Sequence, residues 1–269
     1  MLISIRHITR YRYDRAARSH VLSLRLTPPS FEAQRVLSWS VKAPGYDRSL
    51  RFRDGFGNIG HLASISEPHD EIVVEASGLV ETWDRVGIAR GLVEVAPRPV
   101  YLRQTPMTAP DEAIRKLAAG IEATDLLARL HSLMQRVRDE IDYEIGATSA
   151  HTTAAEALAE KKGVCQDHAQ VFISAARVLG YPARYINGYY LDGGSGESEA
   201  SHAWAEAYVE GIGWVGFDAT NCLCPTDHYV RVAWGLDAIS AAPVRGSRSG
   251  GEKEALDVVV EVQQQNNQQ

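Results

Sequence analysis

Four prolines within fifteen residues divide this 269-residue chain into two parts whose hydrophobic patterns differ. Proline fixes its own φ and has no backbone N–H to donate, so such a cluster prevents a regular helix or strand. The stretch 96–110 therefore predicts a stiff connector. A chain of this length has room for one large domain or two modest ones, and we place the domain boundary at the connector.

The 95 residues before the connector show the two-residue alternation of half-buried strands. Apolar side chains alternate with others at Leu22, Leu24 and Leu26, at Leu37, Trp39 and Val41, and at Ile72, Val74 and Ala76. Asp54-Gly55 marks a turn between two strand-like runs. The pattern predicts several short strands that form an antiparallel, sandwich-like β domain over residues 1–95.

The part after the connector combines helices with strands. Helices are expected over Asp111–Ala119, over Leu126–Ile141, where apolar residues recur at three- and four-residue steps, and from Cys165 to Leu179. Strands are expected at 183–191, 201–209 and 214–219. We therefore predict an α+β chain whose core, residues 111–262, packs helices on an antiparallel sheet. Residues 263–269 are all Gln or Asn and predict a disordered tail.

Composition argues against several classes of function. The chain has 34 acidic and 28 basic residues, a net charge of −6, which disfavours a nucleic-acid surface. An arginine-rich run near the N-terminus, 6–18, is interpreted as the solvated face of a strand, with a phosphate or RNA patch as the alternative. No signal peptide and no apolar run of about 18 residues is present, so we expect no membrane association. Three cysteines without an export signal predict a reduced, cytoplasmic protein.

Cys165 opens the third predicted helix, directly after Gly163-Val164. In a helix's first turn a thiol faces unpaired backbone N–H groups and the positive end of the helix dipole, and both favour the thiolate. The same N–H groups suit the oxyanion of a tetrahedral intermediate. The alternative is a buried cysteine that only fills space.

His202 and Asp218 lie on two neighbouring predicted strands. If residues 210–212 form a three-residue loop, Val209 faces Gly213, and His202 lies diagonal to Asp218 on the same sheet face. Diagonal neighbours are about 7–8 Å apart, within reach of an Asp–His hydrogen bond. A two-residue loop would turn Asp218 to the other face.

These blocks together resemble the bacterial transglutaminase-like family. The resemblance rests on Gly163-Val164-Cys165-Gln166-Asp167, on Ser201-His202-Ala203-Trp204, and on Gly213-Trp214-Val215-Gly216-Phe217-Asp218-Ala219-Thr220-Asn221, in the order that family has. Tyr11-Arg12-Tyr13-Asp14, Asp54-Gly55-Phe56-Gly57-Asn58 and the stretch 227–237 extend it over nearly the whole chain.

The resemblance implies a papain-like core with a Cys-His-Asp triad and no cofactor or metal. Cys165 would be the nucleophile, His202 its base and later the acid for the leaving group, and Asp218 the group that orients the imidazole. Tyr143 matches an aromatic position upstream of the nucleophile and is the candidate for binding the oxyanion through its hydroxyl; a core tyrosine is the alternative. The expected partner is a peptide or protein substrate, and oligomeric state is not predicted.

Two departures from the family pattern leave other readings open. His168 stands at a position where the family usually has an aromatic residue, and Cys222 and Cys224 stand where it usually has glycine. With Cys165 they make four potential zinc ligands, although a structural role for Cys222 and Cys224 is preferred. Asp167 and His228 are expected to be polar packing residues.

The reaction itself is also open. Water as acceptor gives hydrolysis, which we favour, and an amine gives transglutamination. A binding module without catalysis is a third possibility. The stretch 192–200, with three glycines and two serines, could act as a lid beside His202 or be an ordinary hairpin loop.

Overall fold

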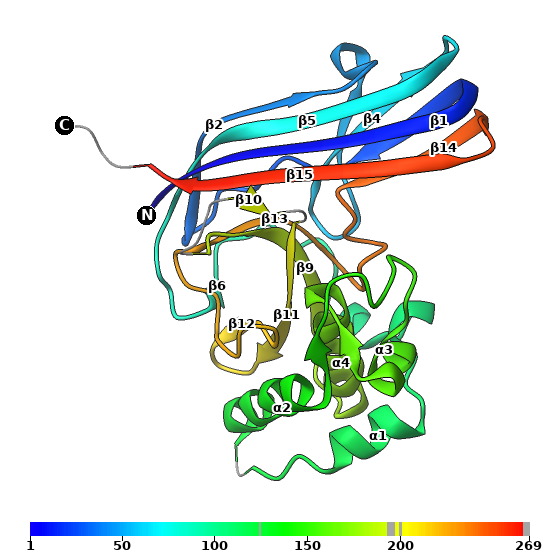
Figure 1. Cartoon of the computed structure of the whole chain (residues 1–269). Helices are drawn as coiled ribbons and strands as arrows, with labels where there is room; N and C mark the ends of the chain where they lie inside the picture. The colour runs from blue at the N-terminus through cyan, green and yellow to red at the C-terminus, as the bar shows by residue number, and fades with distance from the viewer. Residues whose placement is uncertain (124, 193–196, 199–200, 266–269) are drawn as a thin grey trace.

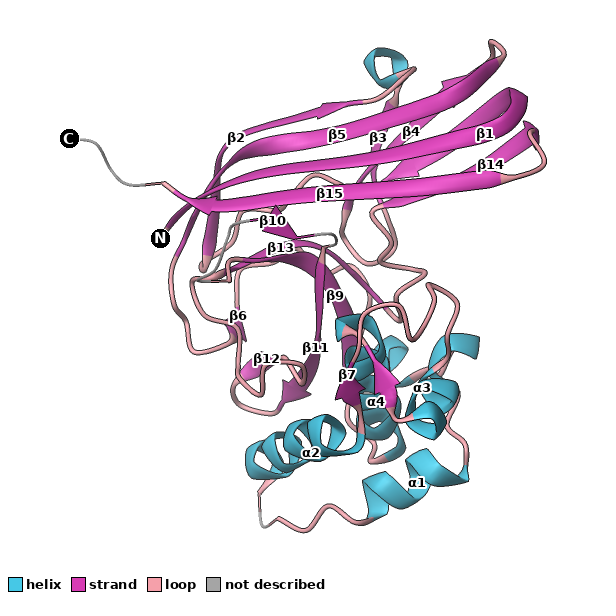
Figure 2. Ribbon diagram, in the orientation of Figure 1, coloured by secondary structure: helices cyan, strands magenta, loops and turns pink. Residues whose placement is uncertain are grey.

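The computed structural model describes residues 1–123, 125–192, 197–198 and 201–265. A large β-sheet lies across one side of the molecule, and a smaller sheet with the helices lies against it (Figures 1 and 2). Within the described part of the chain, the strands are β1 (Leu2–Leu24), β2 (Gln34–Lys42), β3 (Leu50–Arg53), β4 (Ile59–Ile65), β5 (His69–Thr82), β6 (Ile88–Ala89), β7 (Asp142–Tyr143), β8 (Lys162–Gly163), β9 (Ala183–Tyr190), β10 (Glu197–Ser198), β11 (His202–Val209), β12 (Gly213–Phe217), β13 (Tyr229–Gly235), β14 (Val244–Gly250) and β15 (Glu254–Gln264). The helices are α1 (Glu112–Ala119), α2 (Leu126–Glu140), α3 (Ala154–Glu160) and α4 (Cys165–Val178), with short 3-10 turns η1 (Tyr46–Arg48), η2 (Arg98–Leu102) and η3 (Pro106–Thr108).

The β domain is antiparallel, as predicted, and its described strands form one curled eight-stranded sheet. Its centre is β1, a single strand of 23 residues where several short strands were expected. The first half of β1 pairs with β5 and β15, and its second half pairs with β4 and β14. The register against β5 shifts between Arg12 and Ala17. The change of partners at this irregularity lets one strand serve both halves of the curled sheet.

The C-terminal boundary of the predicted core is wrong. Residues 244–264 return to the large sheet, where β14 and β15 pair with β1 at the opposite end of the chain. The predicted tail begins within β15, since Gln264 pairs with Ile3. A β-ladder is built from backbone groups, so polar side chains do not prevent pairing. Of the predicted tail, 266–269 lie outside the described residues.

The connector is packed against the core. It forms η2 and η3, and its side chains Tyr101 and Met107 are buried. Arg177, near the end of α4, donates from Nε to the Tyr101 carbonyl (3.0 Å) and from Nη1 to Thr108 Oγ1 (2.9 Å). The β-domain boundary is also shifted, because β6 pairs with β12 of the smaller sheet.

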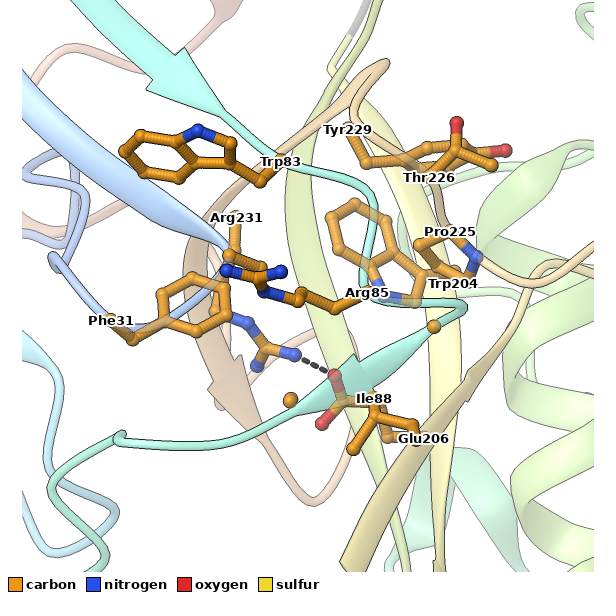
Figure 3. A pocket seen from close by; sticks show the side chains of 13 residues that line it. Phe31, Trp83, Arg85, Ile88, Trp204, Glu206, Pro225, Thr226, Tyr229 and Arg231 are labelled. Atoms are coloured by element: carbon orange, nitrogen blue, oxygen red, sulfur yellow. Dashed lines mark ion pairs between the residues drawn. The ribbon is translucent and has the colours of Figure 1, made fainter. Parts of the chain in front are cut away.

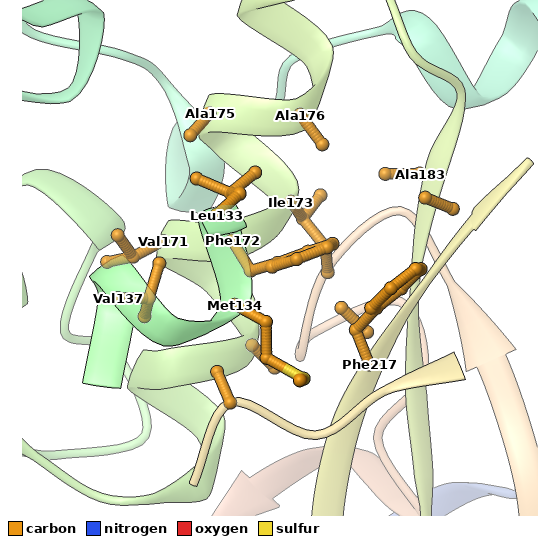
Figure 4. Packing of buried hydrophobic residues seen from close by; sticks show 14 of the residues in the cluster. Leu133, Met134, Val137, Val171, Phe172, Ile173, Ala175, Ala176, Ala183 and Phe217 are labelled. Carbon is orange, nitrogen blue, oxygen red and sulfur yellow. The ribbon is translucent and has the colours of Figure 1, made fainter. Parts of the chain in front are cut away.

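The smaller sheet is antiparallel, as predicted, in the order β13-β9-β11-β12-β6. One face of β11 carries Ala203, Ala205 and Ala207, with Val209 at its end, and α4 packs on it. Phe172 of α4 stacks on Phe217 of β12 with ring centroids 5.2 Å apart (Figure 4). Small side chains on the strand let the helix approach closely, and this brings the start of α4 near the start of β11.

Three of the four described helices match the prediction. α1 and α2 begin after the N-caps Asp111 and Asp125, and α4 begins at Cys165. α3 was missed, although Thr153 and Glu156 form a capping box that the sequence spells out. None of the helices among the described residues combines the length and apolar character needed to span a bilayer.

Candidate active site

The start of α4 is held by Asp167, which is fully buried. Its Oδ2 accepts hydrogen bonds from Val164 N (2.8 Å) and Thr148 Oγ1 (2.6 Å). A Cβ at Gly163 would come 2.7 Å from the Asp167 side chain, so only glycine fits there. Asp167 thus positions the turn before Cys165, in agreement with its predicted packing role.

The first turn of α4 leaves donors near the thiol. Early helical N–H groups have no acceptor within their own helix. The N–H of Val164 bonds to Asp167, and those of Asp167 and His168 bond to the Val164 carbonyl. The N–H groups of Cys165 and Gln166 remain. They could donate to the oxyanion of a tetrahedral intermediate, which forms when the Cys165 sulfur attacks a carbonyl group.

The hairpin of β11 and β12 has the predicted register. Val209 pairs with Gly213 and Ala205 with Phe217, so residues 210–212 are the odd-length loop that the Asp–His contact requires. His202 Nε2 lies 2.7 Å from Asp218 Oδ2. The structure therefore brings His202 and Asp218 together as the sequence predicted.

Asp218 is buried and accepts several hydrogen bonds. Oδ2 accepts from Tyr229 OH (2.7 Å) and Asn221 Nδ2 (2.8 Å) in addition to His202, and Oδ1 accepts from Thr220 N (3.0 Å). Burial alone would raise the pKa of Asp218, but the hydrogen bond and charge of His202 lower it. Asp218 is consequently an anion with a fixed orientation.

His202 faces Asp218 with Nε2, which leaves Nδ1 for the thiol. Burial alone would lower the pKa of His202; hydrogen bonds with Asp218 and Cys165, together with their charges, outweigh it and raise the pKa from 6.5 to about 10. Tyr190 and Tyr229 lie beside the ring, with centroids 5.4 and 5.8 Å away. The three predicted triad residues thus form one contiguous arrangement in which an imidazolium is favoured.

His168 is a second histidine near the triad, but it is fully buried and neutral. Burial lowers the pKa of His168 to about 4. Its Nε2–H donates to the Ile141 carbonyl (3.1 Å), and its Nδ1 accepts from Thr220 Oγ1 (2.9 Å). His168 therefore ties α4 to the loop that follows Asp218.

Tyr143 lies on β7, whose backbone pairs with β8 just before α4. Burial raises the pKa of Tyr143, and the charges of Cys165 and Asp218 add to the effect. Its side chain is 45% exposed, so it is not a core tyrosine. The position is close to the thiol, and the oxyanion role stays a prediction.

The zinc alternative fails on geometry. Across the described residues, which include Cys165, His168, Cys222 and Cys224, no three His, Cys, Asp or Glu side chains converge as metal ligands. Both ring nitrogens of His168 are already engaged. Cys222 has a positive φ of 53° in the loop after Asp218. The three cysteines are unpaired.

A small cavity has Trp204 and Tyr229, two neighbours of His202, in its wall. Figure 3 shows Arg231 and Glu206 joined there as an ion pair. Glu206 also accepts from Arg184 Nε (2.7 Å), and all three side chains are buried. This ion-pair cluster, Arg184–Glu206–Arg231, ties β9, β11 and β13 together below the triad.

The predicted lid falls largely outside the described residues, which omit 193–196 and 199–200. Within it, Glu197 and Ser198 form β10 and pair with β15. The stretch therefore reaches the edge of the large sheet.

Sequence reasoning missed the partners of Asp218 and the ion-pair cluster. Asn221 was inside a quoted motif, but nothing in the pattern assigned it a bond. Tyr229 lies on a separate strand, and its approach to Asp218 depends on a pairing of β13 with β9 that includes a register shift. An alternation of charged and aromatic residues on β11 was the only signal for Glu206.

Comparison with known proteins gives matches along most of the chain. A family model described as the transglutaminase-like superfamily matches residues 115–219, which contain Cys165, His202 and Asp218. A model described as the bacterial transglutaminase-like N-terminal region matches residues 3–81.

Relatives and solved structures cover nearly the full length. An uncharacterized protein of Mycobacterium leprae, ML0607, is 30% identical over 276 residues, 95% of this chain and 96% of its own. An uncharacterized protein of Mycobacterium tuberculosis H37Rv, Rv2569c, is 29% identical over 96% of this chain and 91% of its own. The crystal structure of a provisionally assigned cysteine protease from Cytophaga hutchinsonii has a TM-score of 0.75 at 22% identity, covering 98% of this chain and 90% of that one. This last likeness shows a shared fold.

Proposed function

Because this chain belongs to the transglutaminase-like superfamily, we propose that it is a thiol hydrolase that cleaves an amide bond in a peptide or protein. The observation that carries the proposal is the 2.7 Å contact of His202 with Asp218, beside a Cys165 thiol whose hydrogen bond and charge help to raise the pKa of His202. An imidazole held between a carboxylate and a thiol is the arrangement that activates a sulfur nucleophile.

In the first half of the reaction, the Cys165 thiolate attacks the carbonyl carbon of the amide. The oxygen of the tetrahedral intermediate is bound by the free N–H groups at the start of α4. The His202 imidazolium gives its Nδ1 proton to the departing nitrogen, the C–N bond breaks, and an amine leaves. A thioester on Cys165 remains, and Asp218 holds the ring throughout.

In the second half, neutral His202 removes a proton from water, and the resulting hydroxide attacks the thioester. The C–S bond breaks, the acid leaves, and the thiolate–imidazolium pair is restored. An amine in place of water would give a new amide, as in a transglutaminase. The triad serves both acceptors, and we propose water as the natural one.

Alkylation by iodoacetamide tests the nucleophile, and the chain supplies its own controls. Burial raises the pKa values of Cys222 and Cys224, so both should react slowly at neutral pH. Cys165 should react fast, and His202→Ala should slow it while leaving the other two unchanged. Mass spectrometry of the labelled peptides measures each site. Equal rates at all three cysteines would contradict the proposal and favour a binding module.

A peptide library incubated with and without a primary amine tests the acceptor. We expect cleaved peptides in both cases, with Cys165→Ala inactive. Amine-modified products in place of cleavage would replace the hydrolase with a transglutaminase. The cytoplasmic location stays a prediction, supported by three unpaired cysteines.

A further inference from the structure

A cavity of about 580 Å³ lies where the β domain meets the core. Thr9 and Tyr11 of β1 and Leu256 and Val258 of β15 form one wall. The loop between β13 and β14 contributes Ile239 to another side. The volume is within the range of about 300–1,000 Å³ that is common for ligand sites. Strands from both ends of the chain thus enclose a space large enough for several side chains.

The cavity adjoins the catalytic pair. Gln166, the residue after Cys165, and Ser201, the residue before His202, both line it. Tyr185 also lines the cavity. Burial raises the pKa of this tyrosine, and the charge of the nearby Cys165 raises it further. A substrate bound at the thiol would therefore extend into this space.

The wall formed by β15 is apolar and open. Leu256 is 59% exposed although it lines the cavity, and its neighbour Val258 is only partly buried. An exposed apolar surface inside a concave site is typical of ligand binding. A second cavity of about 310 Å³ shares Tyr11, Val244 and Leu256 with the first. The shared residues show that the two cavities adjoin beside β1 and β15.

The charges around the cavity have one sign. Its lining residues are all described and include no Asp or Glu, whereas Arg245 is one of them. His7 also lines it, but burial lowers the pKa of His7 to about 4, so that ring is neutral. In the first cavity a basic ligand would find no carboxylate, and an acidic one would meet Arg245. The adjoining cavity adds Glu254, but Arg248 pairs with it at 2.6 Å.

From this placement we propose that the cavity is the specificity subsite for the substrate chain: it takes a large apolar side chain beside the scissile amide and favours acidic over basic neighbours. The proposal rests on the function proposed above and assigns a role to the β domain. β1 and β15 select the substrate, while the core carries the reaction.

Binding to the Cys165→Ala protein tests the subsite without turnover. The probes are short peptides that carry Phe or Ser beside the target amide, each flanked by Glu or by Lys. We expect the Phe–Glu peptide to bind most tightly by calorimetry. Leu256→Asp should weaken its binding at least about tenfold, because a buried apolar contact is lost and a like charge is introduced.

Val259→Asp is the matched control. Val259 lies on the same strand, is 41% exposed and does not line the cavity. It should leave binding unchanged. Arg245→Glu should reverse the preference between Glu and Lys flanks, whereas Arg18→Glu, an exposed change elsewhere on the β domain, should not. Equal effects of Leu256→Asp and Val259→Asp, or no effect of either, would overturn the proposal.

The outcomes separate the subsite from the chemistry. Binding that depends on Leu256, with no cleavage by the native protein, would keep the subsite and reject the hydrolase. Cleavage that is indifferent to Leu256 and Arg245 would keep the hydrolase and reject the subsite. Alkylation of Cys165 should proceed at the native rate in Leu256→Asp, which shows that the triad is intact.

Discussion

Two buried polar regions lie on the same face of β11, and their charges are arranged in opposite ways. At the start of the strand, His202 bonds to Asp218 and turns its other nitrogen to a thiol. Further along, Glu206 is held between two guanidinium groups, Arg184 and Arg231. The first region can exchange a proton between sulfur and imidazole. The second cannot, because arginine stays protonated in proteins.

The difference in charge arrangement suggests that the first region serves reactivity and the second serves stability. The His202 side chain is 14% exposed and meets the substrate side, whereas the Glu206 side chain is 2% exposed. The ion-pair cluster joins three strands of the smaller sheet, and those strands carry His202 and Tyr229. We therefore expect changes in the two regions to affect different measurements: reactivity at the triad, and stability at the cluster.

The largest effect is expected from Asp218→Asn. An amide cannot stabilise the imidazolium and favours the wrong ring tautomer, so kcat should fall about 10³–10⁴-fold. The free energy of unfolding should change little, because the asparagine can keep part of the hydrogen-bond network of Asp218. Steady-state kinetics with urea denaturation measures both. A variant that loses stability but keeps kcat would reverse the assignment of the two regions.

Glu206→Ala should produce the opposite result. Removal of the carboxylate leaves two buried guanidinium groups without their shared anion, which should lower the free energy of unfolding by about 3–5 kcal/mol. The rate of Cys165 alkylation per folded molecule should stay near the native value. Glu94→Gln is the control, since Glu94 is partly exposed and lies 3.4 Å from Arg184; its cost should be at most about 1 kcal/mol.

The pH at which activity declines on the alkaline side should depend on the His202 region and not on the ion-pair cluster. The pKa of His202 is raised to about 10, so its contribution to stability is fully present below about pH 6.5 and is lost as pH rises through about 10. Asp218 has a lowered pKa, so its contribution is present above about pH 4 and is lost as pH falls further. The rate of hydrolysis should accordingly decline near pH 10.

Asp218→Asn should move this decline to lower pH, because the contribution that raises the pKa is removed. Glu206→Ala should not move it. A decline of the native protein's activity near pH 7 would show that the imidazolium lacks the support of Asp218. The pH dependence of kcat/KM gives the comparison directly.

The sequence predicted the contact of His202 with Asp218 from local features, and the resemblance to the transglutaminase-like family added Cys165. The loop 210–212 sets the parity that brings Asp218 to the face of His202. Cys165 comes two residues after Gly163, where a Cβ would lie 2.7 Å from the Asp167 side chain. Each of these features involves a few consecutive residues and a known side-chain period.

What could not be predicted depends on contacts between distant segments. The return of β15 to β1 joins residues about 250 positions apart, and its alternating valines fit either domain. The ion-pair cluster needs three strands in one register. Whether His168 is charged depends on its burial, which the sequence does not reveal.

The smallest effect is expected from Thr220→Val, which removes the hydroxyl that donates to His168. Loss of this partly buried hydrogen bond should lower the free energy of unfolding by about 1–2 kcal/mol. Because the pKa of His168 is lowered to about 4, this ring is neutral at working pH, and the alkaline decline near pH 10 should stay in place. Thr226→Val, at a residue that lines the small cavity outside this contact, is the control. A shift of the decline in Thr220→Val would mean that His168 shares the proton of the triad, and the two histidines would then act as one coupled site.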